Sequence, residues 1–205
     1  MVYVPPVQYL LRTSSVAAAL VTLIAIGSPD QKLTAGTSGA GSPAHYETAT
    51  FAGGCFWGLQ ESLRHLPGVI HTTVGYTGGT TPNPTYETVR TGKTGHAEAV
   101  QVIFDPAQLS YEKLLDHFFQ SHDPTSPRHR SDGRKVQYRS AIFYHTEEQR
   151  RIAERVKEQM TQSGKRPDPV VTEITLATKF YPAEACHQDY LEKNSAEQTC
   201  HVWQN

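Results

Sequence analysis

Segments with the pattern of a strand and segments with the pattern of a helix alternate from Tyr46 onward, and this alternation limits the fold more than any other feature of the sequence. Residues 46–52 have the composition of a short strand, Gly53 and Gly54 form a turn, and residues 56–65 carry apolar side chains at helical spacing. A strand, a glycine turn and a helix in direct succession are typical of proteins in which helices pack on a sheet.

The same alternation continues along the chain. Further strands are predicted at 69–76, 97–104, 139–144 and 170–176, and further helices after Ser110, after Thr146 and from Pro182 to about Lys193. Loops are predicted at 77–84 and 121–136. No internal repeat is found. We therefore predict an α/β (α+β) fold, a two-layer sandwich with a mixed sheet and a ferredoxin-like core.

The first 45 residues differ in composition from the rest of the chain. They hold a single arginine, Arg12, and no carboxylate before Asp30. Their apolar run, 16–26, has 11 residues, whereas a helix that spans a bilayer needs about 20. We predict a leader over these residues and one folded domain at 46–205.

The role of this leader stays open between three interpretations. The apolar run has the length of a secretory h-region, and Ala25-Ile26-Gly27 offers a small-x-small cleavage site, so export or membrane anchoring through residues 1–28 is the first. An organelle transit peptide is the second. A disordered leader on a cytoplasmic protein is the third, because the region before the run is long and carries little positive charge.

Composition excludes two classes of protein. The chain of 205 residues is 38% hydrophobic, enough to build a core. Nineteen Lys and Arg against twenty Asp and Glu give a net charge of −1, without the basic excess that binds a phosphate backbone, so no nucleic acid is expected as a partner. The three cysteines, Cys55, Cys186 and Cys200, cannot all pair, which excludes a closed disulfide framework and directs attention to reactive thiols.

Cys55 is the first candidate for such a thiol. It follows the glycine turn and begins the predicted helix, whose unpaired N–H groups and positive pole stabilise a thiolate. Phe56 and Trp57 come next and would give the thiol an apolar pocket. The alternative is a cysteine that is simply a small buried side chain.

Six stretches of the chain together resemble the A-type peptide methionine sulfoxide reductases. They are GGCFWG at 53–58, GYTGG at 75–79, PNPTY at 82–86, TGHAEA at 94–99, HDP at 122–124 and QYRS at 137–140. The resemblance extends from about Thr48 to Asn194, within the domain 46–205. It implies a monomeric enzyme that reduces methionine (S)-sulfoxide, in proteins and as the free amino acid, and so repairs oxidised proteins. It also implies no cofactor and no metal, with thioredoxin or another dithiol as the reductant.

The resemblance implies a role for each of several side chains. Cys55 is the expected nucleophile, Glu98 the acid that protonates the departing oxygen, and Tyr86 and Tyr138 the phenols that orient it; Phe56 and Trp57 form the pocket for the methyl group. The chemistry agrees, because reduction needs a thiolate, an acid and an apolar wall. Small apolar neighbours at the start of a strand would bury the carboxyl of Glu98 and keep it protonated, although most glutamates are solvated surface charges.

Two further residues are expected in the substrate site. Asp132 matches a family aspartate, but it stands one residue further from Tyr138 than is usual, so either the loop bulges or Asp132 is an ordinary solvated residue. His187 resembles a family position near the active site, although a histidine on a helix more often serves packing. The histidines at 117, 122 and 129 lack a tight ligand spacing, and no Cys-x-x-Cys pair exists, so no metal site is predicted.

The resemblance also gives the two remaining cysteines different roles. Cys200 lies in the tail, where the family carries its resolving cysteine, so the sulfenic acid formed on Cys55 is expected to condense with it to a disulfide. Cys186 stands where the family often has an aromatic residue, and we expect it to be structural.

Two other classes of function fit parts of this pattern. A papain-like hydrolase also places a tryptophan beside an activated cysteine, but it needs a general-base histidine and has no use for a second thiol. A binding module for methionine-rich surfaces could use the same aromatic pocket without consuming thiols.

Overall fold

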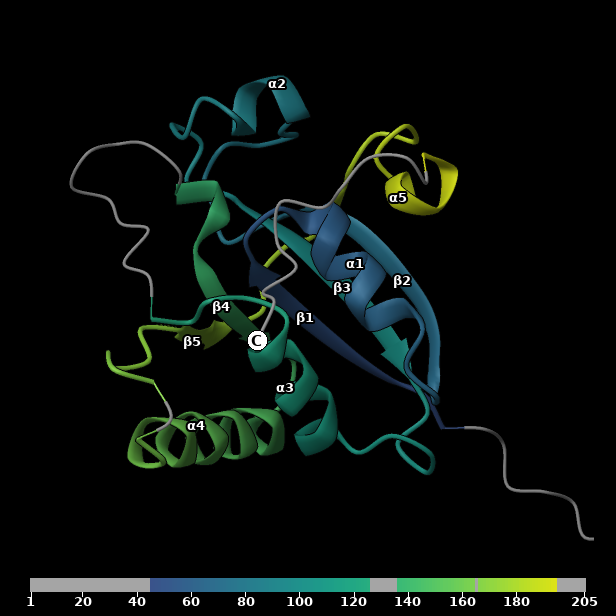
Figure 1. Cartoon of the computed structure of the whole chain (residues 1–205). Coiled ribbons are helices and arrows are strands. Elements are labelled where there is room, and N and C mark those ends of the chain that lie inside the picture. The colour runs from purple at the N-terminus through teal and green to yellow at the C-terminus, as the bar shows by residue number, and fades with distance from the viewer. Residues whose placement is uncertain (1–44, 126–135, 165, 195–205) are drawn as a thin grey trace, which may run out of the picture. The chain divides into compact units, whose positions relative to one another are not determined.

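The computed structural model describes residues 45–125, 136–164 and 166–194, and these residues form one mixed sheet with helices packed on it (Figure 1). The strands are β1 (Glu47–Gly53), β2 (Val69–Thr77), β3 (Ala97–Phe104), β4 (Ser140–Tyr144), β5 (Glu173–Leu176) and β6 (Tyr181–Pro182). The helices are α1 (Phe56–Arg64), α2 (Tyr86–Val89), α3 (Tyr111–Gln120), α4 (Glu147–Gln162), α5 (Tyr190–Lys193) and the 3-10 helix η1 (Val136–Tyr138).

The sheet has the strand order β5-β4-β1-β3-β2-β6. Its four central strands, with α1 after β1 and α3 after β3, have the order β4-β1-β3-β2 and pair antiparallel throughout, which is the ferredoxin-like arrangement. The edge strand β5 pairs with β4 in parallel, so the sheet is mixed. The predicted fold class, mixed sheet and ferredoxin-like core are therefore confirmed.

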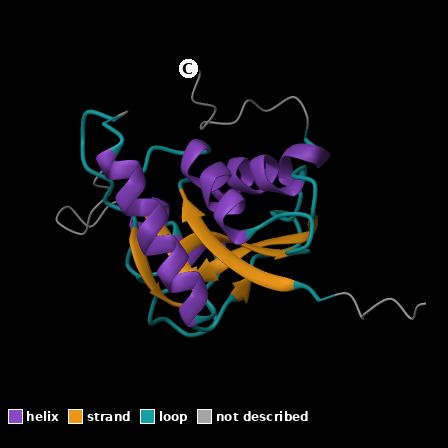
Figure 2. Cartoon of the chain, turned by 90° about the horizontal axis from the view of Figure 1, so that it is seen from below, coloured by secondary structure: helices purple, strands orange, loops and turns teal. Residues whose placement is uncertain are grey.

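The core lies between the sheet and its helices (Figure 2). On β3 the side chains alternate between the two faces: Val100, Val102 and Phe104 belong to the large cluster under the helices, while Ala97 and Ala99 join a smaller cluster on the other face. Each fully buried large apolar side chain contributes about 1.5–3 kcal/mol. The same alternation places Glu98 on the helix-covered face of the sheet.

Most predicted elements are confirmed within one to three residues at each end. Two of the helices begin at the caps expected from the sequence, because the Ser110 hydroxyl accepts the Lys113 N–H and the Thr146 hydroxyl accepts the Gln149 N–H. The four-residue helix α2 was not predicted; it begins at a capping box formed by Thr85.

The predicted helix from Pro182 to Lys193 is wrong. Residues 181–182 instead form the edge strand β6 against β2, where the Ala183 N–H donates to the Val74 carbonyl. Gln188 also binds Val74 through two hydrogen bonds. The Val74 N–H donates to the side-chain carbonyl of Gln188, and the side-chain amide of Gln188 donates to the Val74 carbonyl. Pairing with the open edge of the sheet satisfies these backbone groups better than a helix, and only the last turn, α5, is helical.

Several predictions concern residues outside the described ranges. These are the leader up to residue 44, most of the loop at 121–136 with Asp132, and the tail with Cys200. Among the residues that are described, no helix has the length and apolar character to cross a membrane.

Candidate active site

Cys55 lies where β1 ends and α1 begins, at the N-cap of the helix. Gly54 before it has φ +91°, a left-handed conformation that costs other residues about 1–2 kcal/mol, and this turn swings the chain from strand into helix. The Cys55 carbonyl accepts the Leu59 N–H, and the side chain is half-buried at the positive end of the helix. That pole favours the ionised form of a thiol.

Glu98 is joined to the Cys55 turn by one hydrogen bond. Its carboxylate oxygen Oε2 accepts the backbone N–H of Phe56 at 3.1 Å, and its side chain belongs to a residue only 1% exposed. Burial raises the pKa of Glu98 from 4.5 to about 7, although the Phe56 N–H acts in the opposite direction. An acid with a pKa near neutrality next to a nucleophile can deliver a proton during the reaction.

The pKa values of Tyr86 and Tyr138 are both affected by the charges of Glu98 and Cys55. Burial raises the pKa of the Tyr138 phenol to about 12, with further contributions from the charges of Glu98 and Cys55. Burial likewise raises the pKa of Tyr86, with the charges of Glu98 and Cys55 adding to it. Both phenols therefore stay protonated and can donate hydrogen bonds beside the thiol and the carboxyl.

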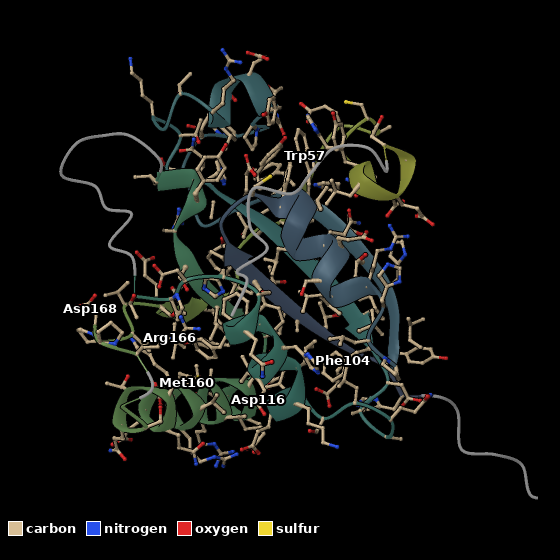
Figure 3. All side chains as sticks on the ribbon, in the orientation of Figure 1. Trp57, Phe104, Asp116, Met160, Arg166 and Asp168 are labelled. Carbon is tan, nitrogen blue, oxygen red and sulfur yellow. The ribbon has the colours of Figure 1, made fainter. Side chains whose placement is uncertain are left out.

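An aromatic group surrounds the first turn of α1. Phe56 is fully buried beneath the turn, whereas Trp57, labelled in Figure 3, is half-buried and stacks on Tyr190 with ring centroids 3.8 Å apart. The Trp57 Nε1–H donates to His187 Nδ1 at 3.3 Å, and the His187 ring lies 4.4 Å from that of Tyr86. The two residues predicted to form the pocket thus lie together, with ring centroids 6.3 Å apart, Phe56 buried and Trp57 partly exposed.

His187 is held as a neutral ring in this group. Burial lowers its pKa, and the carboxylate of Glu184, 4.0 Å from Nε2, opposes that effect. Because Nδ1 accepts from Trp57, the proton of the neutral ring sits on Nε2. His187 therefore orients the Trp57 indole.

Three residues in contact with the site were not identified from the sequence. Tyr76 is fully buried opposite Glu98 in the sheet register, Glu184 accepts the Tyr76 O–H at 2.9 Å, and Tyr190 stacks on Trp57. Strand alternation alone could have placed Tyr76 beside Glu98, since both face the helices. Glu184 lies in the segment 182–193, for which the sequence predicts a helix that does not form, so no local pattern indicates its contacts.

Two remaining candidates have other surroundings. Cys186 is exposed on the turn before His187. His122 is buried against the end of β1, where a β-carbon on Gly53 would lie 3.0 Å from its ring; its Nε2 is 2.7 Å from the Ser140 hydroxyl and its Nδ1 2.8 Å from the Phe118 carbonyl. Across the described ranges, no three His, Cys, Asp or Glu side chains form a group suited to a metal ion.

Comparison with known proteins agrees with this geometry. Residues 47–205 match the family model described as peptide methionine sulfoxide reductase. The chain is 52% identical over 157 residues to the peptide methionine sulfoxide reductase MsrA of Methanoculleus marisnigri, covering 77% of this chain and 96% of that protein. It is 50% identical over 157 residues to the MsrA of Pseudomonas fluorescens, covering 77% of this chain and 73% of the relative.

Solved structures show the same relationship. The fold is similar to reduced Mxr1 from Saccharomyces cerevisiae, with a TM-score of 0.69 and 32% identity over 78% of this chain and 91% of that one. It is also similar to Mxr1 from Saccharomyces cerevisiae in complex with Trx2, with a TM-score of 0.51 and 26% identity over 73% of this chain and 87% of that one. With a family model that matches most of its length and relatives about half identical to it, the chain belongs to the peptide methionine sulfoxide reductase family.

Proposed function

We propose that this protein is a thiol-dependent oxidoreductase that reduces methionine (S)-sulfoxide, in proteins and as the free amino acid, and so repairs oxidised proteins. The observation that carries the proposal is the hydrogen bond from the Phe56 N–H to Glu98. It places an acid with a pKa of about 7 against the turn that presents the Cys55 thiol. A nucleophile and an acid at this spacing suit a substrate with adjacent sulfur and oxygen atoms.

In the proposed reaction the Cys55 thiolate attacks the sulfur of the sulfoxide. Glu98 gives its proton to the sulfoxide oxygen, while the phenols of Tyr86 and Tyr138 donate hydrogen bonds to it. The attack forms a bond between the Cys55 sulfur and the substrate sulfur, and the protonated oxygen then transfers to the Cys55 sulfur. The S–O bond of the substrate and the new S–S bond break, and methionine leaves. Cys55 is left as a sulfenic acid, so the substrate sulfur is reduced by two electrons and the cysteine sulfur is oxidised by two.

The substrate methyl group would lie against the apolar side of the site. Trp57 supplies the exposed wall, and Phe56 supports it from below, which suits a methyl thioether better than a charged group. His187 fixes the indole ring through its hydrogen bond. Asp132 is proposed to hold the polar end of the substrate.

Recycling requires a second thiol. The Cys200 thiol would condense with the sulfenic acid on Cys55, release water and leave a Cys55–Cys200 disulfide, which a dithiol protein then reduces by exchange. The structural neighbour Mxr1 has been solved with Trx2. We therefore propose thioredoxin as the reductant of this protein.

Cysteine substitutions test the cycle. Cys55→Ser is expected to abolish reduction of a sulfoxide peptide, and Cys200→Ser to give one methionine per enzyme and then stop with oxidised Cys55. Cys186→Ser is the matched control and is expected to turn over with thioredoxin like the parent protein. Mass spectrometry after one turnover should find Cys55 joined to Cys200.

Three outcomes would contradict these assignments. Peptide cleavage without a thiol reductant would favour a hydrolase, and binding of sulfoxide peptides without thiol consumption would favour a binding module. Full recycling of Cys200→Ser by thioredoxin would leave the reductase intact but remove Cys200 as the resolving residue.

A further inference from the structure

The carboxylate of Glu184 binds two parts of the site that lie about a hundred residues before it in the sequence. Its Oε1 accepts the backbone N–H of Tyr86 at 2.9 Å, and its Oε2 accepts the phenolic O–H of Tyr76 at 2.9 Å. Each oxygen thus has its own donor. The segment after β6 is in this way tied both to the first residue of α2 and to Tyr76 on β2, the strand next to β6.

The two partners of Glu184 differ in burial and in their relation to the chemistry. Tyr76 is fully buried and pairs with Glu98 across β2 and β3, so it is a fixed point of the core. Tyr86 begins the four-residue helix α2, which is too short to hold its own position by helical hydrogen bonds. Glu184 therefore fixes the position of Tyr86 relative to β2, the strand that pairs with the acid-bearing strand β3.

Glu184 contributes this restraint from an exposed location. Its side chain is 42% exposed, and hydrogen bonds and ion pairs of surface carboxylates add little to global stability. The carboxylate is also held ionised: although burial raises the pKa of Glu184, its hydrogen bonds from the Tyr86 N–H and the Tyr76 O–H lower it overall. Removing it should disturb the local geometry without unfolding the domain.

We propose that Glu184 is a positioning residue, which holds the Tyr86 phenol in the direction of the sulfoxide oxygen. This inference rests on the proposed function, because Tyr86 is placed there as a donor to that oxygen. Glu184 itself does not touch the substrate in this scheme. Its effect is transmitted through the backbone N–H of Tyr86 and the ring of His187, which is tilted by 37° against the Tyr86 ring with centroids 4.4 Å apart.

Three variants separate positioning from charge and from stability. Glu184→Ala removes both hydrogen bonds and is expected to lower kcat about tenfold with KM unchanged, since misplaced groups lose rate more than binding. In Glu184→Gln, the amide oxygen can accept the Tyr86 N–H and the amide N–H₂ can donate to the Tyr76 oxygen, so kcat should stay within about threefold of the parent. Glu87→Ala is the matched control, because Glu87 is next to Tyr86 on α2 and its carboxylate lies 3.4 Å from Arg90.

A double-mutant cycle tests whether the effect passes through the phenol. In a Tyr86→Phe background, Glu184→Ala should lower kcat by no more than about twofold further. A full tenfold loss in that background would overturn the proposal and make Glu184 a structural residue. So would equal losses of kcat in Glu184→Ala and Glu87→Ala.

A measurement that needs no activity keeps this inference separate from the proposed function. Hydrogen exchange of the Tyr86 amide, followed by NMR, should accelerate in Glu184→Ala and stay slow in Glu184→Gln and Glu87→Ala. If the parent protein reduces no sulfoxide but exchange follows this pattern, the restraint on Tyr86 stands and the assigned reaction fails. If exchange at Tyr86 is the same in all variants, the restraint itself is refuted.

Discussion

Burial raises the pKa of Glu98, which suits its proposed role as an acid, and it also lowers the free energy of unfolding when the carboxyl is ionised. In the unfolded chain its carboxyl releases a proton near pH 4.5, whereas in the folded protein it keeps that proton to about pH 7. Between these values the unfolded state binds fewer protons, so the free energy of unfolding falls as the pH rises through this window. The loss amounts to about 3 kcal/mol above pH 7.

Replacement of Glu98 by Gln should therefore stabilise the fold and lower the catalytic activity. The amide oxygen can still accept the Phe56 N–H, and no charge has to be buried. We expect the variant to unfold at a higher temperature than the parent at pH 8, with little difference at pH 4. Its kcat should fall about 10²-fold or more, because the proton donor is gone.

The pH dependence of both properties provides the check. For the parent protein kcat should decline above about pH 7 as Glu98 ionises, and this decline should be absent in Glu98→Gln. Melting curves from pH 4 to pH 8 give the stability. An unchanged kcat would remove Glu98 as the acid, and an unchanged melting temperature at pH 8 would show that its burial is relieved by water.

At the scale of elements, local signals predicted the helices α1, α3 and α4, whereas long-range pairing determined the segment after β5. The capping residues Ser110 and Thr146 lie within one turn of the N–H groups that they bind, so a short stretch of sequence is enough to predict these caps. The segment 181–193 carries a proline and polar residues that also suit a helix start. Its conformation depends on the open edge of β2, about a hundred residues earlier, which no local pattern shows.

The contact between β6 and β2 depends on a glycine. A β-carbon on Gly75 would lie 2.4 Å from the Tyr181 carbonyl oxygen and 2.6 Å from Cζ of Phe180. Gly75→Ala should therefore push β6 away from β2 and cost about 1–3 kcal/mol of stability, as overpacking does. Since Glu184 and His187 follow β6, kcat should fall as well.

Hydrogen exchange at the Ala183 amide reports directly on this contact, because that N–H donates to Val74. Thr73→Ala, on the same face of the strand and partly exposed, is the matched control and should change neither exchange nor kcat. Slow exchange at Ala183 in Gly75→Ala would mean that the strand pair accommodates the methyl group.

At the scale of the molecule, the ferredoxin-like core gathers groups from distant parts of the chain. Cys55 follows β1, Glu98 lies on β3 and Tyr138 precedes β4, three strands that are neighbours in the sheet. The motif resemblance predicted a site role for each of these three residues. The stacking of Trp57 on Tyr190, and the bonds of Glu184, depend on side-chain packing between segments and could not be predicted from composition or periodicity.

The described helices and strands all lie between Glu47 and Lys193. We propose that residues 46–205 are the catalytic domain and expect a chain that starts at His45 to fold and to keep kcat within about twofold of the full-length protein. Melting curves and sulfoxide reduction with a chemical dithiol provide the comparison. A folded shortened chain without activity would show that the first 44 residues take part in the reaction.

The backbone amide of Phe56 connects Glu98, the proposed proton donor, to the turn that carries Cys55, the proposed nucleophile. It belongs to the first turn of α1, and helix ends open more readily than sheet interiors. When that turn frays, nucleophile and acid are separated in a single event. We therefore expect warming to stop catalysis by opening the first turn of α1 while the strands beneath it are still paired.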